Sequence, residues 1–531
     1  MSPGTVDADR FPLDIRPWLP VVAEGATARV GLRELFLRAH QFEGLAVALP
    51  PAASGLMRVL YAMAARVTGL HEDPEGDGDA WLERRYELLA AGAGFDPEAV
   101  DAYFDSCADG LRLFDVSRPF LQDARLGDEC SGSSGVNKLV LARPAGNNQV
   151  FFGHFTDADP VALPAAEAVL HLIAQLYYGP SGQCTPRIVD GRQFGNTRAG
   201  PLRRALSCHP SGRNLYETLL LGIPDPGSWP QSSHTSGSGD ACPWERTGPI
   251  PAPLEPPEPA CGPLSMLTEQ YQHAVLLRPA PDGHSAVDAT ITWALRVNRP
   301  TPHRDPYLIW DESRDGTQHP RGADAQRALW RDLDGMILQN RGSGGRRPPV
   351  FDTLTGGQLP EDVFRELRVT AYGFDQDGQT RDRTYFSAMT PRLLGLLAAS
   401  GTREDTMLAL GAKDGREAAE KAAWRLTTAL RTAWRSYTLP FTEDRPGPGR
   451  AGKKDTGPWP EAALAAYWPK AGDLFWDLLD AGDFTDAVAS FGRIALRVYD
   501  DVTAPVAAQP RGAKARESAR GLVRSLLDRP R

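Results

Sequence analysis

The pattern of apolar residues changes at about Pro391. Before this position, short extended stretches alternate with helical ones and with turns rich in proline and glycine. After it, helical stretches follow one another, and the stretch 484–502 has the apolar periodicity of a bundle face. The change predicts an α+β protein in two parts. We expect a large mixed α/β domain with a β-hairpin and loops over residues 1–388, followed by a C-terminal four-helix-type bundle over residues 389–531.

The chain has 531 residues and a formal net charge of −9. This length allows two or more domains with a sizeable core. The negative charge excludes a uniformly basic nucleic-acid coat, so any contact with DNA must come from local patches or from a partner. The six cysteines are widely spaced and form no C-x-x-C, which argues against a zinc ribbon or a disulfide framework. No apolar run reaches the roughly 18 residues of a membrane span, so we expect a soluble cytoplasmic protein that does not bind membranes.

The stretch 368–386, RVTAYGFDQDGQTRDRTYF, predicts a β-hairpin. Residues suited to extended backbone flank Asp377-Gly378, which is a strong signal for a two-residue type I′ turn because Asp tolerates and Gly freely adopts a positive φ. The predicted tip carries Gln376, Asp377, Gly378 and Gln379. Taken alone, this pattern describes an ordinary surface hairpin.

A loop predicted over 137–154 carries groups suited to nucleic acid. It places the cationic and amide side chains of Lys138, Arg143, Asn147 and Asn148 around a Pro-Ala-Gly turn. Such side chains suit contacts with phosphates or base edges, and a solvated loop has the same composition.

A second loop, over 177–186, follows a helical stretch and contains Gly179, Ser181, Gly182 and Gln183. Glycine has no Cβ, so the backbone at Gly179 and Gly182 can approach a ligand closely. A helix C-cap followed by a turn explains the same residues.

Two further segments have a biased composition. Residues 222–263 contain 11 prolines in 42 positions, interleaved with Ser, Gly and Trp. Such a composition buries too little apolar surface to offset chain entropy, so we expect a long excursion or a partly disordered segment. The tail 510–531 carries seven Arg or Lys against two acids, which suits a strip facing phosphates or a partner and equally a solvated helix face.

Several stretches, taken in order, resemble the CasA family, the large subunit of the type I-E CRISPR surveillance complex Cascade. They are PWLPV, LREL…AH, F…RPFLQ and NKL in the first part of the chain, then GPLRRALSCHPSGRNLYETLLLG over 200–222, then the 368–386 hairpin. The resemblance covers roughly residues 11–500. It implies a non-catalytic subunit that recognises the PAM, the short motif beside the target, in double-stranded DNA from the minor groove and starts R-loop formation.

The resemblance also implies roles for particular residues. In the family, a hairpin bearing a glutamine wedges into the duplex beside the PAM, which points here to Gln379 first and Gln376 second. A glycine-rich loop faces the PAM minor groove, which points to the loop 179–183. A lysine from the strand that corresponds to ATITWALRVN reaches the PAM; here Thr292 stands at that position, with Arg296 further along.

The partners implied by the resemblance are the other Cascade subunits (backbone, small and guide-end subunits), the guide RNA, target double-stranded DNA and a helicase-nuclease. In the family, the helical bundle docks on the small subunits. The chain is also expected to present a surface to the helicase-nuclease that degrades the target.

No catalytic constellation stands out in the sequence. The run GPGRAGK over 447–453 matches part of a P-loop, but Lys454 stands where a Ser or Thr would bind Mg²⁺. The histidines show no metal-ligand spacing, and those best placed in loops, His154, His209 and His303, are better explained as structural residues. There is no G-x-S-x-G elbow and no cysteine in a nucleophile motif. We therefore expect no enzymatic activity, no cofactor and no metal.

The residues leave two other functions open. One is an assembly scaffold that never touches nucleic acid, and the other is a hydrolase whose site is too irregular for motif recognition. An enzyme would turn over alone. A scaffold would leave the DNA affinity of its complex unchanged when the hairpin tip is altered.

Overall fold

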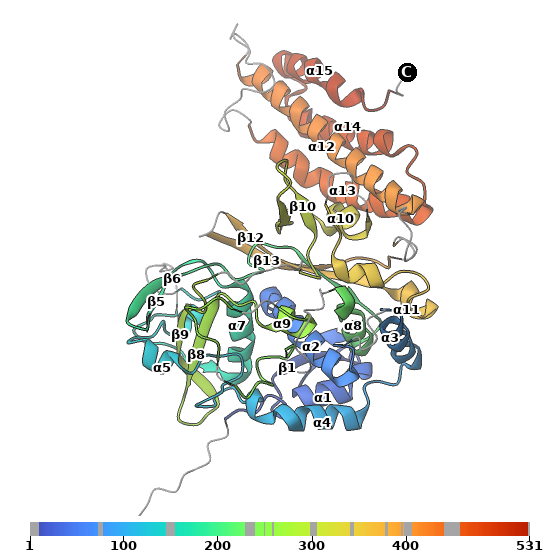
Figure 1. Cartoon of the computed structure of the whole chain (residues 1–531). Coiled ribbons are helices and arrows are strands. Elements are labelled where there is room, and N and C mark those ends of the chain that lie inside the picture. The colour runs from blue at the N-terminus through green and yellow to red at the C-terminus, as the bar shows by residue number, and fades with distance from the viewer. Residues whose placement is uncertain are drawn as a thin grey trace, which may run out of the picture. The chain divides into compact units, whose positions relative to one another are not determined.

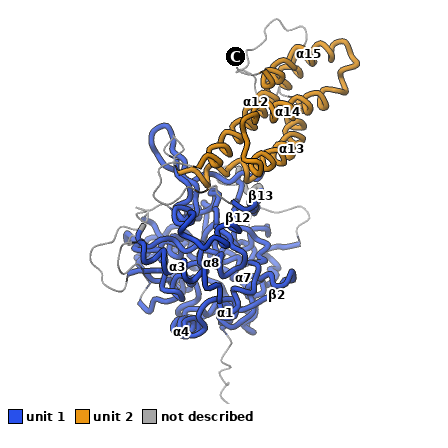
Figure 2. The backbone as a smooth tube through the Cα atoms, turned by 90° about the vertical axis from the view of Figure 1, so that its right-hand side faces the viewer, with its two compact units in different colours: residues 1–326, 340–394, 399–401 blue, residues 327–339, 395–398, 402–531 orange. Residues whose placement is uncertain are grey.

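The computed structural model describes residues 10–72, 78–144, 154–228, 239–248, 250–257, 260–297, 305–339, 345–377, 381–393, 397, 406–439 and 457–528. The fold is mixed α/β with a helical C-terminal region, as predicted. Figure 2 shows its two compact units, of which the first comprises residues 1–326, 340–394 and 399–401 and the second 327–339, 395–398 and 402–531. The sequence division between 388 and 389 differs from this arrangement mainly because 327–339 packs with the C-terminal helices.

The first unit combines short helices with small antiparallel sheets (Figure 1). Its described α-helices are α1 (Leu32–Leu37), α2 (Pro50–Thr68), α3 (Asp79–Ala91), α4 (Pro97–Cys107), α5 (Leu126–Glu129), α6 (Val136–Leu139), α7 (Ala165–Tyr178), α8 (Leu215–Leu221), α9 (Pro263–Thr268) and α11 (Glu361–Glu366). Its described strands are β1 (Leu19–Ala23), β2 (Ala26–Val30), β3 (Gly44–Leu45), β4 (Leu163–Pro164), β5 (Gly182–Val189), β6 (Arg192–Thr197), β7 (Ser207–Ser211), β8 (His273–Pro279), β9 (Ser285–Trp293), β10 (Trp310–Glu312), β11 (Gln318–Pro320), β12 (Arg368–Asp377) and β13 (Arg381–Met389). The sheets have the strand orders β2-β1-β3, β13-β12-β7 and β4-β9-β8, with the two-stranded pairs β5-β6 and β10-β11.

The core of the first unit is built around α2, which is buried on nearly every side. A helix that is surrounded by protein in this way needs apolar side chains on most of its surface rather than along one stripe. Gly55 allows α7 to lie close, because a Cβ at that position would come within 2.6 Å of the side chains of Ile173 and Tyr177.

A buried ion pair ties α2 to the segment that follows residue 304. Arg58 donates from Nη1 to Asp305 Oδ2 at 2.6 Å and from Nη2 to Asp305 Oδ1 at 2.9 Å, and its side chain is 2% exposed. It also donates to Ser207 of β7 at 3.3 Å and lies over the Tyr307 ring, 4.8 Å from its centroid. Burial alone would lower the pKa of Arg58, but the charge of Asp305 raises it, so the guanidinium stays charged.

Aromatic rings continue this cluster to β12. His209 of β7 stacks on Tyr307 with 4.6 Å between the centroids, and its ring meets the edge of Tyr372 of β12 at 5.5 Å. Tyr61 of α2 stacks on Tyr307 at 5.2 Å. The β12–β13 hairpin is therefore fixed to the core through its base.

The predicted hairpin over 368–386 is confirmed as β12 and β13, but the predicted two-residue turn is wrong. Asp377 lies opposite Arg381, so it belongs to the strand and not to the centre of a turn. The connection consists of residues 378–380, and Gly378 and Gln379 lie outside the described residues.

A bulge explains the displaced turn. Asp375 pairs with Thr384, whereas Gln376 pairs with Asp382, so residue 383 is an extra residue on β13. An Asp-Gly pair indicates where the backbone can readily adopt positive φ values, but it does not determine how many residues connect the two strands.

The proline-rich stretch is anchored where the structure describes it; residues 229–238, 249 and 258–259 lie outside the described residues. Trp244 donates to Tyr103 Oη at 2.9 Å, and Glu245 accepts hydrogen bonds from Tyr103 at 2.9 Å and from Arg66 at 3.0 to 3.2 Å. Asp240 accepts from the backbone of α9 at 2.8 and 2.9 Å. A few side chains with buried partners thus hold a segment that has little regular structure.

The described residues of the second unit form a bundle with four main helices: α12 (Met407–Thr438), α13 (Trp459–Ala481), α14 (Ala487–Thr503) and α15 (Pro510–Arg524). The short α10 (Leu333–Ile337) packs with them through the ion pair between Asp334 and Arg416, 3.1 Å. In the basic tail, Arg516 and Arg520 both pair with Asp500, at 2.7 and 2.8 Å, so these two cations serve the bundle itself.

We predict that Asp305→Ala destabilises the first unit strongly. It would leave the buried Arg58 guanidinium without its carboxylate, and breaking a buried pair from one side costs about 3–5 kcal/mol. The free energy of unfolding, measured with urea on the full chain, should fall by that order. Glu361→Ala is the matched control, because Glu361 pairs with Arg365 on the surface at 2.7 Å and should contribute no more than about 0.5 kcal/mol. Equal effects of the two variants would contradict the assignment.

Candidate nucleic-acid interface

The loop after α7 begins with a glycine that serves packing. The backbone N–H of Gly179 donates to Gln175 O at 2.9 Å, which is the helix cap that the sequence allowed. Gly179 is buried, and a Cβ there would lie 2.5 Å from Gln175 O and 2.7 Å from the His273 ring. Its lack of a side chain therefore lets the loop close over α7 and β8, not over an external ligand.

Gly182 is the glycine of this loop that faces outward. It is exposed, its φ is +128°, and no atom lies within 4 Å of the position that a Cβ would take. Gln183 beside it is exposed as well, and Ser181 is half-buried. Gly182 opens β5 and pairs with Thr197 of β6, so the open backbone sits on a paired strand and not on a free loop.

Lys138 lies beside this open backbone. The sequence placed it in a loop, but it is on helix α6, and its Nζ donates to Gln183 O at 3.2 Å. Arg143, from the same predicted loop, donates to Val161 O at 2.9 Å and lies 4.3 Å from the centroid of the Phe155 ring. Lys138 thus contacts the residue next to Gly182, whereas Arg143 contacts Val161 and Phe155. Asn147 and Asn148 lie outside the described residues.

The strands β5 and β6 form a hairpin that the sequence analysis missed. Val189 pairs with Arg192, and the turn residues Asp190 and Gly191 have φ of +48° and +69°. This is the two-residue Asp-Gly turn that was expected at 377–378. The same dipeptide rule, applied at 190–191, could have found it.

A fully buried arginine holds β5 against β9. Arg187 has an exposed fraction of 0%; it donates to Asp123 at 2.9 Å, to Glu129 at 2.6 Å and to Trp293 O at 3.1 Å. These partners neutralise and hydrogen-bond the charge inside the protein. The hairpin therefore has one fixed face on the protein and one face toward solvent.

Thr292 and Arg296 have different surroundings. Thr292, at the position of the family lysine, is fully buried and donates to Thr185 O at 2.6 Å, so its hydroxyl has no path to an outside ligand. Arg296 is half-buried; it donates to Asn196 O at 3.0 Å and lies 4.4 Å from the centroid of the Phe194 ring. Of these two residues, Arg296 is the one near Gly182, because Asn196 pairs with the neighbouring Gln183.

Arg203 links the loop 179–183 to the β12–β13 hairpin. This buried side chain donates to Tyr178 O, at the end of α7, at 2.6 Å, and its guanidinium lies 5.0 Å from the centroid of Phe374 on β12. The segment before it is close as well, since Gly200 N donates to Gly179 O at 2.9 Å. The stretch 200–222 thus connects the two elements that the sequence singled out separately.

Of the four predicted tip residues, the structure describes the side chain of Gln376, which is half-buried, while Asp377 is described as part of the strand. Asp375, next to Gln376, is buried and accepts from Ala325 N at 3.2 Å. The β12 arm is therefore anchored up to the residue before Gln376.

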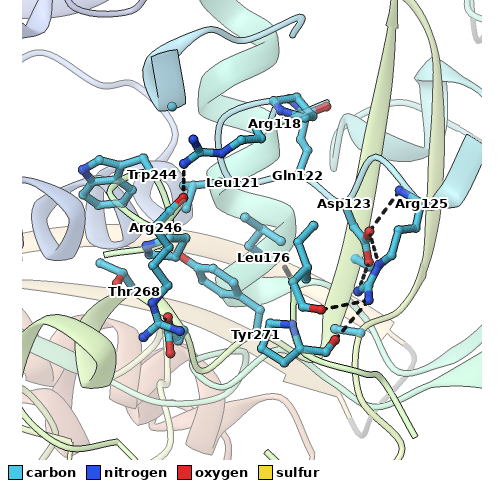
Figure 3. Close-up of a pocket in the computed structure, with 18 of the residues that line it drawn as sticks. Arg118, Leu121, Gln122, Asp123, Arg125, Leu176, Trp244, Arg246, Thr268 and Tyr271 are labelled. Atoms are coloured by element: carbon cyan, nitrogen blue, oxygen red, sulfur yellow. Dashed lines mark hydrogen bonds and ion pairs between the residues drawn. The ribbon is translucent and has the colours of Figure 1, made fainter. Parts of the chain in front are cut away.

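A cavity of about 220 Å³ adjoins the loop 179–183, since His273 and Leu176 line it (Figure 3). Its two carboxylates are paired with arginines: Arg125 donates to both oxygens of Asp123 at 2.9 and 2.8 Å, and Arg246 pairs with Glu269 at 2.7 Å. Arg118, which also lines the cavity, donates to the backbone carbonyl of Arg246. The rest of the lining is largely apolar. No nucleophile next to a base lines this cavity.

Other groups in the described part of the chain also lack a catalytic arrangement. Ser207 Oγ lies 2.9 Å from His209 Nε2, but both residues are buried, and burial and then the charge of Arg58 lower the pKa of His209. His209 lies in strand β7 and not in a loop, which corrects the sequence expectation. His154 is exposed, whereas His303 and the run 447–453 lie outside the described residues. The described residues contain no cluster of three metal-ligating side chains, and none of their helices is both long and apolar enough to cross a membrane.

We predict that the stability of the first unit falls as the pH drops below about 6.5. Burial lowers the pKa of His273 to about 4. Between about pH 6.5 and pH 4, this histidine therefore binds a proton in the unfolded chain but not in the folded chain. The destabilisation that this residue causes should reach about 2 kcal/mol at pH 5. His273 Nε2 donates to Pro180 O at 3.0 Å, and His273→Gln retains a donor while removing the titration. Urea unfolding at pH 7 and pH 5 should show a smaller pH dependence for this variant. His154→Gln, at an exposed site, should behave as the wild type.

Comparisons with known proteins agree on one family. The family model of CRISPR-associated protein Cse1 matches residues 13–501. The CasA/Cse1 protein of Thermus thermophilus is 29% identical over 215 residues. That match spans 40% of this chain and 40% of the relative's length.

Solved structures match over nearly the whole length. A chain of a CRISPR RNA-guided surveillance complex has a TM-score of 0.84 and 39% identity, covering 97% of this chain and 99% of that chain. A chain of such a complex in a pre-nicking state has a TM-score of 0.76 and 39% identity, over 98% and 99%. Thermobifida fusca Cse1, at 19% identity and a TM-score of 0.71 over 98% and 99%, shares the fold.

Proposed function

The chain belongs to the CRISPR-associated protein Cse1 family, and from this premise we propose that it is the Cse1/CasA component of an RNA-guided surveillance complex. In this role it recognises the PAM of target double-stranded DNA from the minor groove and opens the duplex beside it. It has no catalytic activity of its own. Its partners are the other subunits, the guide RNA and the helicase-nuclease that it helps to recruit.

The observation that carries this proposal is the open backbone at Gly182. A backbone without a Cβ, next to the amide of Gln183 and the cation of Lys138, presents donors and acceptors on a surface with no bulk in front of it. The minor groove offers the acceptors N3 and O2 on every base pair and the guanine amino group as its distinctive donor. Amide and backbone groups can satisfy both kinds of partner. They cannot separate A·T from T·A, so tolerance of several PAM sequences follows.

In this proposal, the β12–β13 hairpin carries out the second step, the opening of the duplex beside the PAM. A side chain inserted at a base step costs a few kcal/mol of unstacking, which is offset by contacts that the opened duplex allows. Glutamine lacks the bulk of Phe or Leu, but its amide can occupy the place and the hydrogen bonds of a displaced base. The buried cluster at the base of β12 and the link through Arg203 support this proposal, because they anchor the β12 arm up to the residue before Gln376.

We predict that Gln379→Ala in the assembled complex weakens binding to relaxed linear target DNA by about tenfold, equivalent to about 1.4 kcal/mol. R-loop formation exchanges one duplex for another of nearly equal stability. The variant should therefore slow opening without destabilising the finished heteroduplex. A target with the first PAM-proximal pairs already melted should restore most of the affinity.

The outcomes separate the alternatives. Gln376→Ala tests the second choice for the wedge in the same assay. Equal defects on melted and intact targets would mean that the glutamine makes a simple affinity contact. If neither variant has a defect, the hairpin is an ordinary surface turn and the scaffold function gains support.

We predict that Gly182→Asp weakens PAM-dependent binding by at least tenfold, because it adds bulk and negative charge where the backbone meets the groove. Gly316→Asp is the matched control, since Gly316 is also exposed, has a positive φ (+82°) and has no atom within 4 Å of the position that a Cβ would take. Both variants carry backbone strain, so only the Gly182 variant should reduce discrimination between targets with and without a PAM. Binding of labelled duplex to assembled complex measures this. If both variants discriminate equally between targets with and without a PAM, the loop has only a structural role.

A further inference from the structure

The cavity that His273 and Leu176 line has no part in the proposed function. Its walls come mainly from residues within four segments that lie far apart in the sequence: 118–125, 243–251, 268–274 and 294–295. Its volume is about 220 Å³. An apolar cavity of ~150 Å³ is large enough to bind benzene, so this cavity has room for a body somewhat larger than one six-membered ring.

Two aromatic residues line the cavity, and their polar atoms are bonded outside it (Figure 3). Trp244 donates from Nε1 to Tyr103 Oη at 2.9 Å, and Tyr271 donates from Oη to Tyr177 Oη at 3.3 Å. Neither of these two partners lines the cavity. Trp244 and Tyr271 therefore present ring carbon atoms to it, and such rings suit offset or edge-to-face contact with another aromatic group.

Leu121 contributes to the wall from an unusual backbone conformation. Its φ is +56°, in the left-handed region that residues other than glycine rarely adopt, and its side chain is buried. The next residue holds this conformation in place, because Gln122 donates from Nε2 to Leu113 O at 2.7 Å and accepts from Leu277 N at 2.7 Å. Strained residues of this kind cluster where proteins bind ligands, so Leu121 marks the cavity as a candidate binding site.

The charges around the cavity are unequal, since three arginines and two carboxylates line it. Arg125 is paired with Asp123, and Arg246 is paired with Glu269. The third arginine, Arg118, has no carboxylate partner among the described residues, and its guanidinium donates to the backbone carbonyl of Arg246. A backbone carbonyl accepts a hydrogen bond but does not neutralise the cation. The lining therefore suits a ligand with a single negative charge.

We propose that this cavity binds a small aromatic carboxylate, with the ring against Trp244, Tyr271 and Leu121 and the carboxylate on Arg118. The planar fork of arginine matches the two oxygens of a carboxylate. Inorganic phosphate would bring extra charge and no apolar body, so it fits this lining less well. A bound ligand would connect the proline-rich stretch with the segment 118–125 and with β8, and it should stabilise the folded chain in proportion to its affinity.

The test measures the binding of three probes to the full chain by calorimetry. Indole-3-acetate has both the ring and the acid, indole has the ring alone, and acetate has the acid alone. Indole-3-acetate should bind with a dissociation constant of roughly 1 mM or tighter, indole about tenfold more weakly, and acetate not measurably at the same concentrations. Indole-3-acetate should also raise the melting temperature of the chain, and its affinity should fall as the salt concentration rises.

Arg118→Gln should remove most of the preference for indole-3-acetate over indole and leave the binding of indole unchanged. Arg118→Lys, which retains the cation, should keep part of that preference. Arg112→Gln is the matched control, because Arg112 is a nearby arginine that does not line the cavity and pairs with Asp109 at 3.0 Å. This variant should bind all three probes as the wild type does.

The proposal is overturned if the wild type binds neither indole-3-acetate nor indole, or binds the two equally well. It is also overturned if Arg118→Gln keeps the wild-type preference for the acid. If Arg118→Gln does not fold, the salt dependence of the wild type decides: an affinity for indole-3-acetate that stays constant as the salt concentration rises would show that no cation holds the carboxylate.

Discussion

A guanidinium group keeps its charge when it is buried, and this constraint governs how both candidate DNA-facing elements are held. Arg58 is paired with Asp305 beside the aromatic cluster that supports β12. Arg187 is paired with Asp123 and Glu129 where β5 meets β9. Burying the guanidinium without its carboxylate would cost several kcal/mol of stability. Any packing that keeps the guanidinium buried must therefore also keep the carboxylate beside it. Each element is thus restricted to one position by a charge that cannot be neutralised in any other way.

The two elements are also held relative to each other. Arg203 donates to the last turn of α7 and lies against Phe374 of β12, so the loop that contains Gly182 and the arm of the hairpin share one buried side chain. Recognition of a short motif and opening of the adjacent base pairs must occur at a fixed spacing along the duplex. In the proposed function, the buried Arg203 that the loop and the β12 arm share would keep that spacing.

Much of this architecture could be predicted from local sequence, and the failures have identifiable causes. The bundle and the 368–386 hairpin follow from periodicity and a turn signal. The register of that hairpin does not, because it depends on a bulge beside Asp375, whose buried carboxylate is held by Ala325 N. The anchors of the proline-rich stretch, such as Trp244 on Tyr103, are contacts between residues about 140 positions apart. No local pattern encodes such contacts. The β5–β6 hairpin, in contrast, has a local signal in the sequence, the Asp190-Gly191 turn.

The chemistry expected at this interface explains why so few strong side-chain signals mark it. Exchanging a DNA duplex for a heteroduplex is nearly balanced in free energy, so a protein that starts the exchange needs to supply only a few kcal/mol at one base step. Amides, open backbone and a few cations are enough for this, provided that they do not have to be ordered on binding. In this proposal the larger energies lie in the buried ion pairs behind the surface, which hold the elements in place, and not in the groups proposed to contact the DNA. A site of this kind has no reactive cluster to find, and its function is set by the placement of ordinary residues.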